Sequence, residues 1–158
     1  MQEDLIGIGL SVAAGMALGN RYQGYKGRVY CMMGDGEINE GQIWESAATS
    51  AGFGLDNLCA FVDVNGLQND APTKEVKDMG DLAAKWKAFG WNVQEINGHD
   101  FNEILDALDQ ARATKGKPSV ILAHTVKGKG VPFMENVVVW HGKTPSKEDY
   151  EKAMEALA

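Results

Sequence analysis

Short apolar runs alternate with longer stretches of helical spacing along most of the chain. The run Leu58–Val64 (LCAFVDV) is apolar apart from one acid, which is typical of a strand buried on both faces. Residues 41–51 instead place Ile43 and Ala47 on one side of a helix. The pattern predicts strands at residues 28–33, 58–64, 91–96 and 119–126, and helices at residues 10–21, 41–51, 81–89, 101–115 and after Ser146.

The order of these elements predicts the fold class. A strand, a helix and a second strand within residues 28–64 form a βαβ unit, whose two strands run parallel. Because the alternation continues to the end of the chain, we expect an α/β fold with a parallel sheet and helices on both faces. The sequence has no repeat or linker, so we expect residues 1–158 to form one domain.

Composition and charge exclude several classes of protein. The chain has 44% hydrophobic residues, which is typical of a globular protein, and its apolar runs are too short to span a bilayer. Its first residues are acidic, so we expect no targeting segment and a cytoplasmic location. The net charge of −7 argues against nucleic-acid or membrane binding. Cys31 and Cys59 lie in apolar runs and are expected to be buried free thiols.

Gly34-Asp35-Gly36 stands directly after the first predicted strand. Alone, this triplet is more typical of a tight turn than of a ligand site. The next strand leads into Asn65-Gly66-Leu67, about 30 residues later, and a βαβ unit of that length brings two strand ends side by side. Carboxylate, amide and carbonyl oxygens are ligands for Mg²⁺ or Ca²⁺, and Mg²⁺ commonly also binds phosphate oxygens. The pattern therefore predicts a metal and diphosphate site at Asp35, Asn65 and the Leu67 carbonyl.

Asp35 itself is expected to be an exposed acid at a strand end. An exposed side chain contributes little to stability, so we expect an Asp35 substitution to leave the fold intact.

These residues resemble a known family. The string GDGEINEGQIWESAATSAGFGLDNLCAFVDVNGLQ, with WNVQEINGHD, SVILAHTVKGKGVPFMEN and WHGK further on, is similar to transketolases over essentially the whole chain. The resemblance implies the thiamine diphosphate-binding α/β fold, with thiamine diphosphate and Mg²⁺ or Ca²⁺ as cofactors. It implies metal ligation by Asp35, Asn65 and the Leu67 carbonyl. The cofactor contacts that it implies are Gly34, Asp35, Gly36 through its backbone amide, Glu37, Asn65, Leu67 and His141.

Three catalytic roles also follow from the resemblance. His141 matches a histidine that in transketolases lies near the cofactor and the sugar. Glu40 and Glu45 match acids of a carboxylate network that joins two active sites across a dimer interface. From the residues alone, Glu40 and Glu45 could equally stabilise the first turn of a helix through its dipole.

The resemblance further implies a partner. In transketolases the glutamate that activates the aminopyrimidine ring lies on a separate pyrimidine-binding domain, for which this chain has no room. The glycine-rich segment 4–9 keeps Gly7 and Gly9, the family's upstream histidines are missing, and Ala71 stands where a glycine is frequent. We therefore expect a truncated amino-terminal subunit of a split transketolase. With a separate carboxy-terminal subunit, in a homodimer or heterotetramer, it would transfer a two-carbon ketol unit between sugar phosphates.

Two alternatives remain open at this point. The chain could be a non-catalytic or regulatory remnant that binds thiamine diphosphate. It could also belong to another thiamine diphosphate enzyme, such as a deoxyxylulose-phosphate synthase or a dehydrogenase component.

The other notable side chains are predicted to be structural. His99 is expected to cap the helix that starts near Phe101, and His124 to be a core histidine. Met32 and Met33 are expected to pack in the core, as are Trp86 and Trp91. The segment Lys127–Gly130 (KGKG) could attract phosphate, but it is expected to be a solvated loop. Ser146 and Asp149 predict a capping box for the last helix, whose apolar face is Tyr150, Ala153, Met154 and Leu157.

Overall fold

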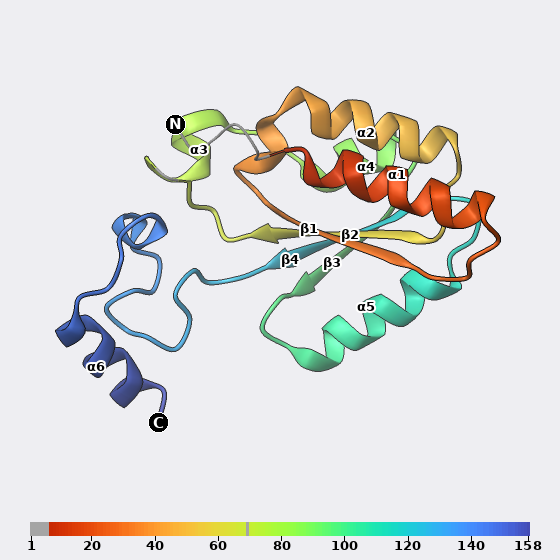
Figure 1. Cartoon of the computed structure of the whole chain (residues 1–158). Coiled ribbons are helices and arrows are strands. Elements are labelled where there is room, and N and C mark those ends of the chain that lie inside the picture. The colour runs from red at the N-terminus through yellow and green to blue at the C-terminus, as the bar shows by residue number, and fades with distance from the viewer. Residues whose placement is uncertain (1–6, 69) are drawn as a thin grey trace.

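The computed structural model of the chain describes residues 7–68 and 70–158 (Figure 1). Residues 4–6 of the glycine-rich segment lie outside this description. The strands are β1 (Val29–Gly34), β2 (Leu58–Val64), β3 (Asn92–Asn97) and β4 (Ser119–His124). The α-helices are α1 (Gly9–Tyr22), α2 (Gly41–Gly52), α3 (Thr73–Lys77), α4 (Leu82–Ala88), α5 (Phe101–Ala113) and α6 (Lys147–Ala156), and the 3₁₀ helices are η1 (Glu37–Asn39) and η2 (Val138–His141).

The four strands form one parallel sheet in the order β1-β2-β4-β3. In this register Gly34 at the end of β1 pairs with Asp63 of β2, and Val64 of β2 pairs with His124 at the end of β4. The carboxyl ends of the strands therefore meet at one edge of the sheet, where ligands bind in folds of this kind. This confirms the predicted α/β fold and parallel sheet.

One face of the sheet is covered by α1, α2 and α4 (Figure 1). These helices bury inward-facing strand residues such as Met33, Val62 and Leu122, each at most 1% exposed. Under α2 and α4, aromatic rings pack closely: the Trp86 ring centroid lies 5.0 Å from that of Trp44 and 4.9 Å from that of Trp91. Burial of such large rings is a main source of folding free energy.

The opposite face is covered by α5 (Figure 1). This helix packs Ala107 and Ala111 against Ile121 and neighbouring residues of the central and far strands. Over the edge strand β1, Tyr30 and Met32 stay 47% and 70% exposed. The prediction that Met32 packs in the core is wrong, because side chains alternate along a strand and Met32 lines a surface hollow beside Leu108 and Arg112 of α5.

Two histidine predictions need correction. The His124 side chain is 54% exposed and its Nε2 lies 3.1 Å from Glu95 Oε2, so it is not a core histidine. The layer of helices does not cover the last residue of β4. The cap of α5 is Asp100, whose carboxylate accepts the Asn102 N–H at 2.8 Å, and the His99 ring is free for another contact.

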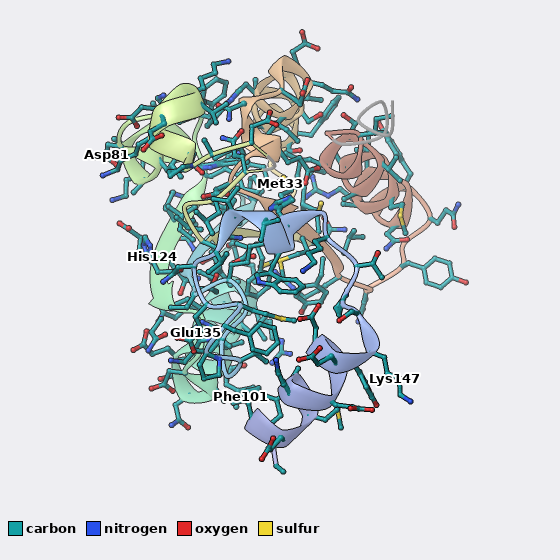
Figure 2. All side chains as sticks on the ribbon, turned by 90° about the vertical axis from the view of Figure 1, so that its left-hand side faces the viewer. Met33, Asp81, Phe101, His124, Glu135 and Lys147 are labelled. Carbon is teal, nitrogen blue, oxygen red and sulfur yellow. The ribbon has the colours of Figure 1, made fainter. Side chains whose placement is uncertain are left out.

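Helix α6, near the carboxy terminus, lies apart from the sheet (Figure 1). Figure 2 shows α6, with Lys147 at its start, apart from the sheet residue Met33. The predicted capping box between Ser146 and Asp149 is present. Tyr150 and Met154 of α6 and its C-cap residue Leu157 are 51–60% exposed, because no helix or strand of the described chain covers them.

The short helices α3, η1 and η2 were not predicted, because three to five residues carry no helical periodicity. Within residues 7–68 and 70–158, no helix is both long and apolar enough to cross a membrane.

Candidate cofactor and metal site

Asp35 lies directly after β1 and is only 3% exposed. Its N–H donates to the Asp63 carbonyl at 3.1 Å, which extends the parallel ladder by one residue. Its Oδ2 accepts hydrogen bonds from the Gly66 N–H at 2.7 Å and from the Thr73 hydroxyl at 3.1 Å. The expectation of an exposed acid is therefore wrong. The turn at Gly66, where φ is +74°, brings the chain after β2 back over the carboxylate.

The buried carboxylate has no balancing positive charge among the described residues. Burial raises the pKa of Asp35, and the nearby Asp63 carboxylate raises it further, while the hydrogen bonds from Gly66 and Thr73 act in the opposite direction. In the described part of the chain, no Lys or Arg side chain forms an ion pair with Asp35. A buried carboxylate without an ion-pair partner favours the binding of a cation.

Asn65 and Leu67 line the same hollow of about 430 Å³ as Asp35. The Asn65 Nδ2 donates to Asp63 Oδ2 at 2.9 Å, and its Oδ1 accepts the Leu67 N–H at 3.0 Å. Asp63 in turn accepts a hydrogen bond from the Thr125 hydroxyl. This network fixes the orientation of the Asn65 amide beside the Asp35 carboxylate.

The oxygen donors of this hollow fit a hard divalent cation. Among the described residues, no group of three or more His, Cys, Asp and Glu side chains is placed to hold a metal ion. A metal here would therefore depend on the Asn65 amide and the Leu67 carbonyl in addition to Asp35, with further oxygens from a ligand. Two buried polar atoms in the lining, Gln68 Nε2 and Asn39 Oδ1, have no hydrogen-bond partner within the described chain. They can bind a polar ligand or water.

Gly34 and Gly36 flank Asp35 and shape the floor of this hollow. A Cβ at position 36 would lie 3.0 Å from Gln68 Cγ, so glycine lets the Gln68 side chain pack across the turn. Glu37 ties this turn to α1: its Oε1 accepts the Gly7 N–H at 3.0 Å and its Oε2 accepts the Gly34 N–H at 3.2 Å. Both Glu37 oxygens are therefore engaged by the backbone. Glu37 lines the hollow, but its main contacts are structural.

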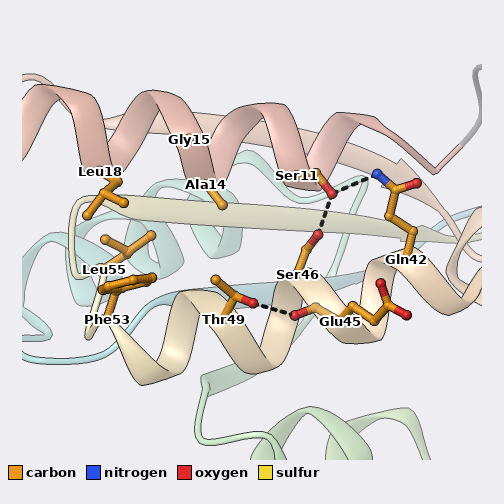
Figure 3. A pocket seen from close by; sticks show the side chains of 10 residues that line it. All are labelled: Ser11, Ala14, Gly15, Leu18, Gln42, Glu45, Ser46, Thr49, Phe53 and Leu55. Atoms are coloured by element: carbon orange, nitrogen blue, oxygen red, sulfur yellow. Dashed lines mark hydrogen bonds between the residues drawn. The ribbon is translucent and has the colours of Figure 1, made fainter.

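The two acids assigned to a carboxylate network lie apart. Glu40 lines the Asp35 hollow, whereas Glu45 lies on α2 in a separate groove between α1 and α2 (Figure 3). In that groove, of about 450 Å³, Gln42 Nε2 donates to Ser11 Oγ at 2.9 Å and Ser11 bonds to Ser46. Glu40 and Glu45 are exposed, and neither carboxylate has a hydrogen-bond or ion-pair partner within the described ranges.

His141 lies in η2 and lines the same hollow as Asp35, although it is more than 100 residues away in the sequence. Partial withdrawal of the ring from water lowers the pKa of His141, and the Lys127 ammonium lowers it further, while the Asp35 carboxylate acts in the opposite direction. Lys127 therefore lies near His141, although its side chain lines a different hollow from that of Asp35. The sequence predicted a solvated loop at this lysine, with phosphate attraction as the alternative.

Comparison with known proteins identifies the family of the chain. The family model described as the transketolase, thiamine diphosphate binding domain, matches residues 5–158. The chain belongs to this transketolase family.

Curated relatives include components of two transketolases. The 6-deoxy-6-sulfo-D-fructose transketolase subunit SqwG of Clostridium sp. is 43% identical, with 96% of this chain and 55% of that protein covered. One of the subunits of the apulose-4-phosphate transketolase of Phocaeicola vulgatus is 39% identical, with 97% of this chain and 54% of that protein covered. The chain thus spans about half the length of these relatives.

The fold also matches solved transketolases. The crystal structure of transketolase from Campylobacter jejuni superposes with a TM-score of 0.90 at 29% identity, with 96% of this chain and 25% of that chain covered. The fold and the thiamine diphosphate-binding family predicted from the sequence are therefore confirmed.

Proposed function

We propose that this chain is the diphosphate- and Mg²⁺-binding subunit of a split transketolase. The complete enzyme would move a two-carbon ketol unit from a ketose phosphate to an aldose phosphate. The observation that carries the proposal is the buried Asp35 carboxylate, which lies without a cationic partner among the described residues in one hollow with Asn65 and Leu67. Family membership supports thiamine diphosphate as the ligand that completes this site.

Each group of the site has a defined task in this proposal. Asp35, Asn65 and the Leu67 carbonyl would hold the Mg²⁺, and the Gly36 N–H would donate to the diphosphate. The network through Asp63 keeps the Asn65 amide oriented before the ligand arrives, which lowers the entropic cost of binding. Lys127 would balance the negative charge of the diphosphate.

His141 would act at the substrate end of the site. Burial and Lys127 lower the pKa of His141, so the ring is neutral at pH 7 and can accept or donate a hydrogen bond to a sugar hydroxyl. When bound, thiamine diphosphate would supply the nucleophilic carbon for ketol transfer. The residues of this chain bind and orient the cofactor and the sugar.

A pyrimidine-binding partner would complete the enzyme. Two of the relatives are named as transketolase subunits, which supports a complex of separate chains. Glu40 and Glu45 are exposed, so both carboxylates are available to a neighbouring chain. We propose that the groove between α1 and α2 faces that neighbour, in a homodimer or a heterotetramer (Figure 3).

The test is a titration followed by an activity assay. Thiamine diphosphate with Mg²⁺ is titrated calorimetrically into the chain, alone and with a pyrimidine-binding subunit from a neighbouring reading frame. Ketol transfer from xylulose 5-phosphate to ribose 5-phosphate is then measured in the mixture. We expect Mg²⁺-dependent binding, and transfer only when both subunits are present.

The outcomes separate the alternatives. Binding without ketol transfer in any mixture would favour a non-catalytic thiamine diphosphate-binding protein. Absence of Mg²⁺-dependent binding, with or without the partner, would contradict the proposed site.

A further inference from the structure

The segment Asn97-Gly98-His99-Asp100 forms a turn between β3 and α5. The Asn97 Oδ1 accepts the His99 N–H at 3.0 Å, and the Asn97 carbonyl accepts the Asp100 N–H at 3.0 Å. Because Asp100 supplies the cap of α5, the His99 imidazole is not needed to start the helix.

The turn rests directly on the end of β4. The Gly98 N–H donates to the His124 carbonyl at 2.8 Å. A Cβ at position 98 would lie 2.5 Å from Thr125 Cγ2, so only glycine permits this approach. The contact places His99 beside the chain that leaves β4.

His99 holds the first backbone N–H beyond the ladder of the sheet. After β4, the last hydrogen bond that continues the sheet ladder runs from the Thr125 N–H to the Val64 carbonyl, at 3.2 Å. The next donor, the Val126 N–H, bonds to His99 Nε2 at 2.7 Å. An acceptor nitrogen carries no proton, so this bond requires an unprotonated Nε2.

The residue after Val126 is Lys127, whose ammonium lies near His141. The loop beyond it is closed by backbone bonds, among them Lys129 N–H to the Val126 carbonyl at 3.1 Å and Asn136 N–H to the Lys127 carbonyl at 3.0 Å. At Gly128, where φ is +75°, the chain turns sharply. The bond from His99 therefore joins this loop to the sheet at the position next to Lys127.

We propose that His99 is a positioning residue, whose Nε2 fixes the Val126 backbone and so holds the adjacent Lys127 near His141. The role of Lys127 toward a diphosphate rests on the proposed function, whereas the anchoring of the loop does not. Neither His99 nor Lys127 lines the Asp35 hollow, and both line a separate hollow of about 720 Å³, so the effect of His99 on a ligand is indirect.

Hydrogen exchange at Val126 tests the anchor in the ligand-free 158-residue chain. The variant His99→Leu removes the acceptor, and His99→Gln keeps an acceptor oxygen near the position of Nε2. We expect His99→Leu to raise the exchange rate of the Val126 amide by about tenfold, and His99→Gln to leave it close to wild type. His124 is an exposed histidine at the end of β4, so His124→Gln is the matched control. It should leave the exchange rate of the Val126 amide unchanged. Unchanged exchange in His99→Leu would overturn the anchor.

The position of Lys127 is tested by titrating His141 by NMR in the same ligand-free variants. Lys127→Ala should raise the pKa of His141, because it removes a nearby positive charge. His99→Leu should raise that pKa as well, and the double variant should add nothing to Lys127→Ala. The inference is overturned if His99→Leu leaves the His141 pKa at its wild-type value, whether or not Lys127→Ala moves it.

Binding of Mg²⁺ with thiamine diphosphate separates this inference from the proposed function. A wild-type chain that binds no cofactor would contradict the proposed function, while the exchange and titration results would still decide the role of His99. Binding that Lys127→Ala weakens but His99→Leu does not would contradict the inference alone. Binding that both weaken, with rescue by His99→Gln, would support both.

Discussion

The two faces of the sheet differ in how they are covered. On one face, α1, α2 and α4 bury Met33 at 1% exposure together with the tryptophan cluster. On the other face, α5 leaves Met32, the adjacent residue of β1, 70% exposed. Neighbouring methionines of the same strand thus have opposite environments, because side chains alternate between the faces.

The candidate metal ligand belongs to the well-packed face. Val29, Cys31 and Met33 alternate inward along β1, and the buried Asp35 continues that alternation one step past the strand. Asp63, the pairing partner of Gly34 in the sheet, lies two residues after Phe61 and therefore faces the side covered by α5. A carboxylate held by a packed layer keeps a fixed position, which is what a metal ligand requires. We therefore expect stability and ligand binding both to depend on this face.

The largest expected effect tests the packed face itself. Met33→Ala removes a fully buried side chain, and such a change costs about 2–5 kcal/mol of unfolding free energy. Urea denaturation followed by circular dichroism measures it. A loss below that range would mean that the face is less tightly packed than the burial of Met33 indicates.

The next effect concerns ligand binding at the end of this face. Asp35→Asn should weaken Mg²⁺-dependent binding of thiamine diphosphate by about 100-fold, equivalent to about 2.7 kcal/mol, because it removes a buried negative charge. Asn is preferred to Ala because it can still accept the hydrogen bond of the Gly66 N–H. Calorimetry measures the affinity. The same substitution at the exposed Asp109 of α5 is the control and should leave the affinity unchanged.

A smaller effect concerns stability and its dependence on pH. The folded state raises the pKa of Asp35, so the contribution of this group to stability is complete below the pKa of an unfolded aspartate and is lost as pH rises through the folded pKa. Without Mg²⁺, Asp35→Asn should therefore be more stable than wild type at pH 7, by about 1 kcal/mol, and the difference should shrink toward pH 4. Urea denaturation at both pH values checks the sign. If the wild-type protein is more stable than Asp35→Asn at pH 7, the predicted sign is wrong.

The smallest effect is expected on the open face. Met32→Ala should change the unfolding free energy by less than about 0.5 kcal/mol, because the side chain is already largely in water. It is the matched partner of Met33→Ala, one residue away. A loss comparable to that of Met33→Ala would show that Met32 is covered in solution, for example by another chain.

Much of the site could be predicted from the sequence because its parts are local signals. Gly34-Asp35-Gly36 and Asn65-Gly66-Leu67 each end an apolar run, and parallel pairing brings such ends together. The sequence did not reveal that Asp35 would be buried, because the covering donors come from Gly66 and from Thr73 in the unpredicted helix α3. Nor did it reveal that Lys127 lies close enough to His141 to lower its pKa, since both lie in a long segment without periodicity.

The sequence alone determined the order of strands and helices, the α/β class and the family resemblance, because periodicity and short motifs are properties of neighbouring residues. Only the tertiary structure decided several exposures that the pattern left wrong or undetermined. It placed Met32 in water, His124 at the surface, and the His99 ring on the Val126 backbone. Burial depends on which elements pack over a residue, and that is set by contacts between segments far apart in the chain.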